Sequence, residues 1–345
     1  MKYFDELYVG KVKDCIKEVI KRYRYQKPIL IYDSHIDVED ILDATIGGVM
    51  RITITKEPTY DVLNQVVGRV REGYLRRKWD VLIVVGGGSM LDIGKACAVM
   101  LTNEGEALRY KGFDKLEYPG LPTILIPTTL TGSDATDNAS FVDDEVKMKM
   151  GINGKYMRAT HVIHDETLLP EKSTRVWAST LMDAYTHAYE SLWSRNATDF
   201  TRTLSMKAIE YLDKGRYQLG AYLAGKALCN SGSGLAGAMS YVLGVHWGIP
   251  HGIAGAIFLV DEARENGDMQ AAEKIERLLS ELRISKNLKD YGIEEDKLQQ
   301  LAEHLHIKSI IRGHYGRLGD SGEKREAENR GNLRQKPRGR VRARV

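Results

Sequence analysis

The sequence lacks the marks of an exported or membrane-spanning protein. No stretch approaches the roughly eighteen consecutive apolar residues of a membrane-crossing helix. The N-terminal segment "MKYFDELYVG" carries acidic side chains in place of an apolar signal core. The three cysteines, Cys15, Cys97 and Cys229, are far apart and form no CxxC pair. We therefore expect a cytoplasmic protein with reduced thiols, without a disulfide framework or a zinc ribbon.

Excess basic charge is absent from most of the chain. The formal net charge of the 345 residues is +3, but residues 317–345 alone hold ten Lys and Arg against four Asp and Glu, a net of +6. The mildly acidic remainder argues against nucleic acid as the main partner of the folded part. Residues 312–345 are also poor in apolar side chains, which predicts a basic, disordered tail. A nucleic-acid-binding arm and a terminus read out of frame are the alternatives.

The first half of the chain alternates apolar, strand-like stretches with helical patterns. Strands are predicted over 28–33, 49–55, 80–89, 121–129 and 160–165, helices over 59–78 and 90–101, and a β-hairpin over 139–152. This βαβ rhythm predicts a mostly parallel sheet covered by helices. After Pro170 helical periodicity takes over, as in "EKIERLLSELR". We therefore expect an α/β domain over 1–168 that binds a dinucleotide and an all-α domain over 169–311 that holds metal and substrate.

A run of small residues separates one buried strand from the next helix. It consists of Gly86, Gly87 and Gly88, followed by Ser89. Without Cβ atoms the backbone can approach a ligand closely, and the free amides of the following helix face an anion. The spacing matches neither a Walker loop nor GxGxxG. The segment "GGGSMLD" is therefore predicted to bind a diphosphate, the alternative being a tight strand–helix turn.

Polar residues also end the neighbouring strands. Asp33 closes the first strand, where a carboxylate can bind a ribose diol and repel a 2′-phosphate, or else cap a helix or turn. The segment "PTTLTGSD" over 127–134 places three threonines after another strand. They can cap the next segment or line a nucleotide groove. Asn138 and Lys149 lie close by in sequence.

The helical half carries a carboxylate and imidazoles in two short motifs. In "DAYTHAYE", Asp183 and His187 are four residues apart and so lie on one helix face. The segment "GVHWGIPHGIAG" adds His246 and His251. A lone histidine is usually a core residue, but this combination predicts a site for iron(II), zinc, nickel or manganese. A divalent ion beside a nicotinamide ring would polarise an alcohol oxygen and favour hydride transfer.

Five segments together resemble the iron-containing (group III) alcohol dehydrogenases and their wider glycerol dehydrogenase and dehydroquinate synthase relatives. In chain order they are "GGGSMLD", "PTTLTGSDATDN", "LMDAYTHAYESLWSRNATDFT", "GSGLAGAMSYVLG" and "PHGIAGAI". The resemblance covers about residues 1–305. It implies a Rossmann-like N-terminal domain, a helical C-terminal domain, NAD(P), a divalent metal and at least a homodimer.

The resemblance also implies roles for individual residues. Asp183, His187 and His251 match three metal ligands, and Asp33 matches the carboxylate that favours NAD over NADP. The residues that match cofactor-binding positions are Gly86, Gly87, Gly88, Ser89, Asp92, Thr128, Thr129, Thr131, Asn138 and Lys149.

Departures from the family pattern concentrate around the metal. The usual fourth ligand, a histidine fourteen residues before the PHG histidine, is Gly237 here, and a further active-site histidine is Tyr241. His246 is a candidate substitute ligand, Tyr241 a candidate proton relay, and Asp134 a candidate substrate contact, as in the polyol relatives. The loop that begins "PTTL" is one residue shorter than in the alcohol dehydrogenases, and the basic tail replaces the family's last helix.

We therefore expect an NAD(P)-dependent, metal-assisted dehydrogenase that acts on a small alcohol, polyol or aldehyde. The alternatives are a lyase of the dehydroquinate synthase kind, which uses NAD transiently, and a non-catalytic relative that has lost the metal. The lyase would need a strongly basic pocket, whereas residues 225–260 contain no Lys or Arg besides Lys226.

Overall fold

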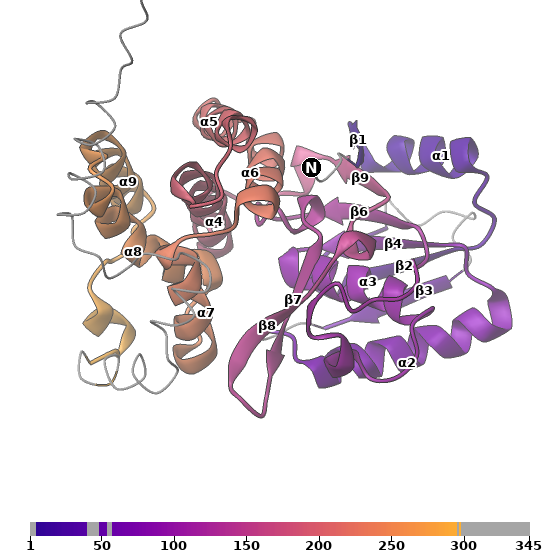
Figure 1. The fold of residues 1–345 in the computed structure, drawn as a ribbon. Helices are drawn as coiled ribbons and strands as arrows, with labels where there is room; N and C mark the ends of the chain where they lie inside the picture. Colours follow the sequence, from indigo (N-terminus) through magenta and orange to yellow (C-terminus); the bar gives the residue numbers. More distant parts are fainter. Residues whose placement is uncertain (1–4, 40–47, 54–56, 295–296, 298–345) are drawn as a thin grey trace, which may run out of the picture.

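The computed structural model describes residues 5–39, 48–53, 57–294 and 297, and its ribbon shows a sheet-containing part followed by a helical part (Figure 1). The predicted fold class, α/β followed by all-α, is confirmed. The elements of the first part are β1 (Glu6–Val9), α1 (Val12–Tyr23), β2 (Pro28–Asp33), β3 (Gly48–Ile52), α2 (Tyr60–Arg77), β4 (Val81–Gly86), α3 (Gly88–Met100), β5 (Gly112–Phe113), β6 (Thr123–Pro127), β7 (Asn138–Asp143), β8 (Met148–Asn153) and β9 (His161–His164).

Six strands form one parallel sheet in the order β1-β9-β6-β4-β2-β3, as the βαβ rhythm predicts. β7 and β8 form the predicted antiparallel hairpin, and β5 pairs with β8. The sequence did not reveal β1, because this edge strand has only four residues and none of them is fully buried. β3 ends at Ile52, before the predicted end at residue 55, and residues 54–56 lie outside the described part.

Successive residues of the central strands face opposite sides of the sheet, and each side has its own helices. Ile29 and Ile31 of β2 belong to a core shared with α2 and α3, whereas Leu30 between them packs in a core shared with α1. Because both faces are covered, β4 is apolar without alternation. The carboxyl ends of the parallel strands share one edge, and the loops that follow β2, β4 and β6 therefore begin close together.

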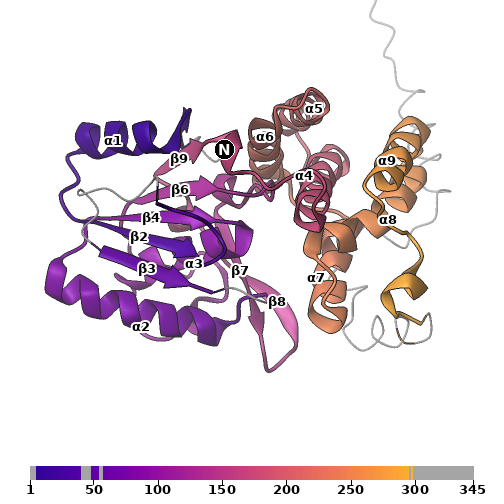
Figure 2. The ribbon, with the colours of Figure 1, turned by 180° about the vertical axis from the view of Figure 1, so that it is seen from behind.

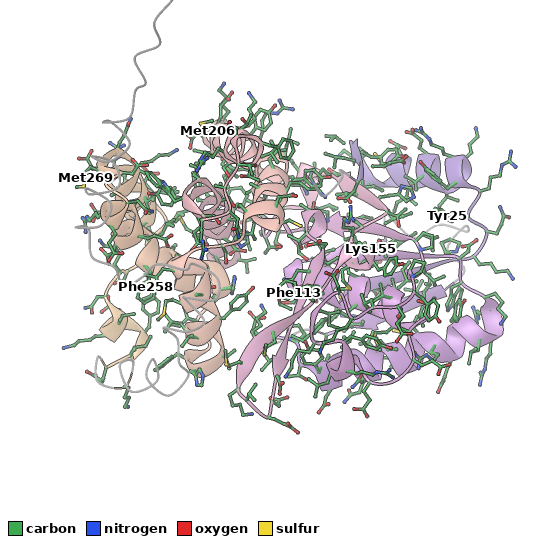
Figure 3. The ribbon with its side chains drawn as sticks, viewed as in Figure 1. Tyr25, Phe113, Lys155, Met206, Phe258 and Met269 are labelled. Atoms are coloured by element: carbon green, nitrogen blue, oxygen red, sulfur yellow. The ribbon has the colours of Figure 1, made fainter. Side chains whose placement is uncertain are left out.

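The second part consists of helices alone: α4 (Arg175–Trp193), α5 (Asp199–Asp213), α6 (Tyr217–Ser231), α7 (Leu235–Trp247), α8 (His251–Glu265) and α9 (Met269–Glu281). The hydroxyl group of Thr174 caps the start of α4. No helix in the described ranges combines the length and apolarity needed to cross a membrane. Large apolar side chains that are more than half exposed, such as Phe113, Met206 and Met269, come from different elements (Figure 3). The predicted tail over 312–345 lies outside the described residues.

Helix α6 joins the two parts. In both views it lies between the edge of the sheet and other helices (Figures 1 and 2). A Cβ on Gly225 of α6 would lie 2.6 Å from the Gly132 carbonyl oxygen, so the two backbones are in contact. One residue on, the Lys226 ammonium pairs with the Asp5 carboxylate, and both side chains are buried. This pair ties the start of the described chain to the helical part.

Helix α8 crosses α4 at a point that has no room for a side chain. A Cβ on Gly252 would overlap the Ser179 carbonyl oxygen and would lie 2.9 Å from Asp183 Cβ. Glycine therefore allows the two helix backbones to touch. The contact determines how His251, the preceding residue, faces α4.

We predict that Gly252→Ala lowers the free energy of unfolding by about 3 kcal/mol, because the added methyl group forces α8 away from α4. Urea unfolding measures this change, provided that the slope of the transition is unaltered. Gly255→Ala is the matched control on the same helix, since its Cβ would lie 3.4 Å from Ala236 O, an ordinary contact. Equal destabilisation by the two substitutions would contradict the close approach.

Candidate metal centre and cofactor cradle

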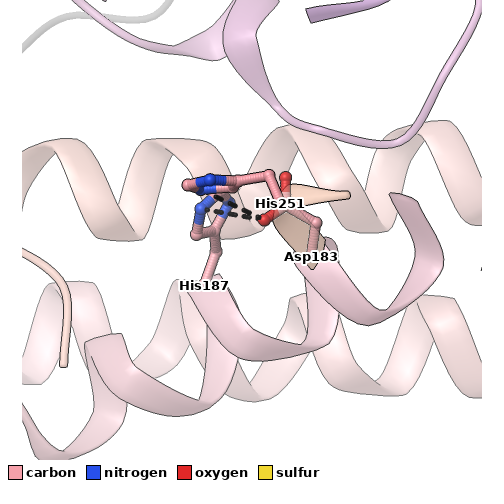
Figure 4. A group of neighbouring side chains, drawn as sticks. All are labelled: Asp183, His187 and His251. Atoms are coloured by element: carbon pink, nitrogen blue, oxygen red, sulfur yellow. Dashed lines mark ion pairs between the residues drawn. The ribbon is translucent and has the colours of Figure 1, made fainter. Parts of the chain in front are cut away.

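Asp183, His187 and His251 converge on one point (Figure 4). Asp183 and His187 project from α4 one turn apart, and His251 is the first residue of α8. The Nε2 atoms of His187 and His251 lie 3.6 Å and 3.8 Å from Asp183 Oδ1. One ligand atom from each residue lies within 4.8 Å of the others. The structure thus brings together all three residues that were predicted to bind metal.

These three side chains are chemically suited to a divalent cation. Burial lowers the pKa of His251 to about 3, although the nearby Asp183 carboxylate acts in the opposite direction. His251 is therefore neutral near pH 7, and neutral imidazole is the form that binds a metal. Two imidazole nitrogens and one carboxylate oxygen suit iron or zinc.

A buried carboxylate fills the space beside Gly237, where the resemblance places a fourth ligand. Glu190, one turn after His187 on α4, is 1% exposed, and its Oε1 accepts a hydrogen bond of 2.8 Å from the Gly237 amide. A Cβ on residue 237 would lie 2.8 Å from Glu190 Oε2. An imidazole at this position would therefore require Glu190 to move. Glu190 was not predicted from the sequence, although it lies on the same face of α4 as Asp183.

Glu190 forms a pair with Glu262 of α8 at the start of α7. The Ala236 amide donates to Glu262 Oε2 at 3.0 Å, as the Gly237 amide does to Glu190. Burial and the neighbouring Glu262 raise the pKa of Glu190 well above its ordinary value, and burial raises the pKa of Glu262 as well. The pair therefore holds a proton near neutral pH, and the N-terminus of α7 stabilises the remaining negative charge.

Tyr241 lies between the metal ligands and the β7–β8 hairpin. Its ring centre is 4.9 Å from that of His251, and the Lys149 ammonium is 5.6 Å from its ring centre. Burial raises the pKa of Tyr241, so the phenol keeps its proton near neutral pH. His246 is exposed near the end of α7 and is not in the ligand group found among the described residues. Its role as a substitute ligand stays a prediction.

The glycine triplet connects β4 to α3 and lies against the loop after β6. Gly87 is the N-cap of α3. Because glycine has no side chain, no capping side chain accepts a hydrogen bond from the amides of the first turn. A Cβ on Gly88 would lie 2.7 Å from Thr131 Oγ1, and one on Gly87 would lie 3.3 Å from Thr129. The Thr128 amide donates to the first carbonyl of the triplet at 3.0 Å. Triplet and threonines thus form one cradle at a helix N-terminus, an arrangement suited to phosphate groups.

Asp92 and Lys95, one turn apart on α3, hold the following loops in place. Asp92 accepts hydrogen bonds from the Ser133 hydroxyl and the Ser140 amide, and Lys95 Nζ is 3.2 Å from Asp92 Oδ1. The buried Lys95 ammonium also donates to the carbonyl oxygens of Ser133 and Asn138. Lys95 was not predicted from the sequence, although its spacing from Asp92 indicates an ion pair on a helix.

Two further residues that were predicted to bind the cofactor, Asp33 and Lys149, lie outside this cradle. Asp33 ends β2 beside the triplet, since a Cβ on Gly86 would lie 3.5 Å from Asp33 Cβ. Its Oδ1 is 2.8 Å from His35 Nδ1. On the hairpin, Lys149 pairs with Glu57 at 2.7 Å. Burial disfavours the Lys149 ammonium, but Glu57 and other neighbours outweigh burial and raise its pKa, so it stays charged.

Asp134 and Asn138 follow the threonines in the chain. Asp134 is buried, and its Oδ2 lies 2.9 Å from His164 Nε2. Asn138 Nδ2 donates to Ser140 Oγ at 3.0 Å, and its buried Oδ1 has no hydrogen-bond partner among the described residues. A substrate contact by Asp134 and cofactor contacts by Asn138 and Ser89 stay predictions.

Two family descriptions match most of the described chain. Residues 7–166 match "Iron-containing alcohol dehydrogenase", and residues 177–268 match "Fe-containing alcohol dehydrogenase family, C-terminal". The chain is 31% identical over 279 residues to 1,3-propanediol dehydrogenase of Klebsiella pneumoniae, covering 68% of this chain and 72% of that protein. It is 26% identical to lactaldehyde reductase of Escherichia coli (strain K12), over 84% of this chain and 88% of that protein.

Solved structures share the fold. A 1,3-propanediol oxidoreductase superposes with a TM-score of 0.78 at 24% identity, covering 91% of this chain and 100% of that chain. The sulfoacetaldehyde reductase of Bifidobacterium kashiwanohense, solved in complex with NAD+, superposes with a TM-score of 0.75 at 22% identity. The match covers 87% of this chain and 90% of that chain. At these sequence identities, the structural similarity establishes the fold alone.

We predict that Glu190→Gln makes the stability of the metal-free protein less dependent on pH. The raised pKa of Glu190 means that folding favours its protonated form, so the free energy of unfolding falls as pH rises above the ordinary carboxyl value of 4.5. Glutamine keeps the acceptor for the Gly237 amide and does not ionise. In urea unfolding between pH 5 and 8, the wild type should lose about 1 kcal/mol per pH unit relative to the variant until Glu190 is ionised.

The matched control for this experiment is Glu276→Gln. Glu276 is a partly exposed carboxylate of α9 whose pKa is lowered, chiefly by a hydrogen bond from Lys286. It is ionised throughout this pH range in both folded and unfolded chains, so the control should leave the slope unchanged. Identical slopes for Glu190→Gln and wild type would contradict the shared proton.

Proposed function

Because this chain belongs to the iron-containing alcohol dehydrogenase family, we propose that it transfers hydride between NAD and a small alcohol, polyol or aldehyde at the Asp183–His187–His251 cluster. The chain is an NAD(P)-dependent dehydrogenase of a family that uses iron or another divalent metal. The relatives named for 1,3-propanediol and lactaldehyde support a small oxygen-bearing substrate.

One set of contacts carries this proposal, because it links the two halves of the site. Lys149, on the hairpin of the first part, lies 5.6 Å from the centre of the Tyr241 ring. That ring lies 4.9 Å from the ring of His251, a proposed metal ligand. The hairpin and the metal ligands are therefore separated by the thickness of one aromatic side chain. A nicotinamide ring and a substrate oxygen have to come together on this scale.

The glycine turn is the proposed diphosphate site. The N–H groups of the first turn of α3 and the Ser89 hydroxyl would donate to the phosphate oxygens, and the threonine loop would close the cradle. At the end of β2, Asp33 would accept hydrogen bonds from ribose hydroxyl groups and repel a 2′-phosphate, which favours NAD over NADP. Asn138 and Lys149 would contact the cofactor from the hairpin.

Asp183, His187 and His251 are the proposed metal ligands. A bound divalent ion would polarise the substrate oxygen and lower the pKa of its hydroxyl group, which favours departure of hydride from carbon. Asp183 brings the negative charge, and the two imidazoles contribute neutral nitrogen donors. All three are placed by rigid helices, so the ligand positions depend on helix packing and not on a loop.

Tyr241 is the proposed proton carrier. Burial raises its pKa, so the phenol holds a proton near neutral pH, and in reduction of an aldehyde this proton would pass to the new hydroxyl group. The Lys149 ammonium beside its ring connects it with the hairpin. His246 and Asp134 remain secondary candidates. His246 is exposed, whereas the buried Asp134 lies 2.9 Å from His164 Nε2.

The two alternatives find less support. The curated relatives are dehydrogenases and reductases, which disfavours a lyase that uses NAD transiently. The convergence of three ligand atoms opposes a relative that has lost the metal. We further propose a dinucleotide-binding domain over 1–168, a metal and substrate domain over 169–311, assembly into a homo-oligomer and a cytoplasmic location.

We predict that Asp183→Asn lowers kcat/KM by about a thousandfold, because a bound metal supplies several kcal/mol of charge stabilisation and each 1.4 kcal/mol is a factor of ten. NADH absorbance with a panel of alcohols and polyols measures the rate. Asp261→Asn is the matched control, an exposed carboxylate of α8 that pairs with Arg264. A chelator should abolish wild-type activity and a divalent metal should restore it. Full activity of the chelated enzyme would contradict the metal's role.

We predict that Asp33→Ala raises the ratio of kcat/KM for NADP to that for NAD by about a hundredfold. The substitution removes the repulsion of the 2′-phosphate and one charge-assisted hydrogen bond of roughly 3 kcal/mol to the ribose. Steady-state kinetics with both cofactors measures the ratio. Asp37→Ala removes an exposed carboxylate from the same loop and controls for net charge. The assignment of Asp33 fails if the two variants change the ratio equally.

A further inference from the structure

Ser240 places a hydroxyl group beside the metal ligands from a third helix, α7. It lies one turn after Gly237 and is 1% exposed. Its Oγ is 3.1 Å from His251 Nε2, the same nitrogen that faces Asp183 Oδ1. Ser240 lies within the segment "GSGLAGAMSYVLG", but no role was predicted for it from the sequence.

The proton and the lone pairs of this hydroxyl group point to different partners. Ser240 Oγ is 2.6 Å from the Gly237 carbonyl oxygen, to which a serine in a helix commonly donates its proton. With the proton engaged there, the oxygen presents a lone pair toward His251 Nε2. A hydroxyl oxygen with an unused lone pair can bind a metal ion. It would do so here if the ion took the place of a proton on His251 Nε2.

The distances agree with a shared coordination sphere. With metal–ligand bonds of about 2.1 Å, neighbouring ligand atoms are about 3.0 Å apart in an octahedron and about 3.4 Å apart in a tetrahedron. The separation of 3.1 Å between Ser240 Oγ and His251 Nε2 lies within this range. The separations of 3.6 Å and 3.8 Å that involve Asp183 are slightly longer. The distance from Ser240 Oγ to His251 Nε2 is therefore that expected for two ligand atoms of one ion.

We propose that Ser240 Oγ is the fourth protein ligand of the metal, in place of the histidine expected at Gly237. The inference rests on the proposed function and deepens it. Glu190 occupies the space beside residue 237, and the serine one turn later directs an oxygen to the ligands. Replacing an imidazole nitrogen by a neutral oxygen lowers the affinity for zinc and iron and increases the relative preference for manganese.

Cobalt(II) is the probe that tests this assignment. The full-length protein is freed of metal with a chelator and titrated with cobalt, and the wild type should bind one ion per chain. Ser240→Ala should weaken cobalt binding by about 10- to 100-fold. Ser240→Cys should place a thiolate on the ion and give a sulfur-to-cobalt charge-transfer band in the near ultraviolet. The wild type should lack this band, which controls for Cys15, Cys97 and Cys229.

Both results are required. Unchanged cobalt affinity in Ser240→Ala, or bound cobalt without the new band in Ser240→Cys, overturns the ligand role of Ser240 and leaves the proposed function standing. A wild type that binds no cobalt overturns the metal site and the role of Ser240 together. Ser231→Ala controls for the loss of a buried helical hydroxyl, since Ser231 is 2% exposed and bonds to the Ala227 carbonyl at 2.9 Å. Thermal unfolding of every variant verifies the fold.

Discussion

The backbone contact between α4 and α8 is the constraint on which the rest of the site depends. Gly252 allows the helices to approach until no Cβ fits between them. This approach brings His251 to within 3.8 Å of Asp183, although the two residues are distant in sequence. Ligands on two packed helices keep their separation as long as the packing persists. Metal binding therefore carries no free-energy cost for ordering loops. Precision at the site is therefore a property of helix packing.

The same region buries several ionisable groups, and each has a partner that fixes its charge. Lys149 remains charged because Glu57 lies beside it, whereas burial and the neighbouring acid Glu262 raise the pKa of Glu190 well above its ordinary value. Asp92 and Lys95 neutralise each other and bind the loops around the cofactor cradle. A cation among Asp183, His187 and His251 would complete this balance of charge. The charged groups that pair with each other, such as Asp92 and Lys95, stabilise the fold. Asp183, His187 and His251 are available to a ligand.

The sequence predicted those features that depend on neighbours in the chain. Apolar runs located the strands, because a sheet covered on both faces leaves no polar alternation. Helical spacing placed Asp183 and His187 on one face, and a second motif offered His246 and His251 as partners, of which the resemblance matched His251 to a metal ligand. Glu190 and Ser240 were missed, because the role of a buried polar side chain depends on a partner that lies on another helix. Lys95 was missed although its helical spacing from Asp92 indicates an ion pair. The edge strand β1 was missed for a different reason, since its partial burial leaves no pattern.

The buried pair between Lys226 and Asp5 has a consequence for how the two parts of the molecule are joined. Lys226 lies on α6 of the helical part, and Asp5 directly precedes β1 of the sheet. Loss of either partner, with the other left buried, would cost several kcal/mol, because an uncompensated charge would remain between the sheet and the helices. The attachment of α6 to the sheet therefore depends on a residue of the N-terminal segment that is far away in the sequence.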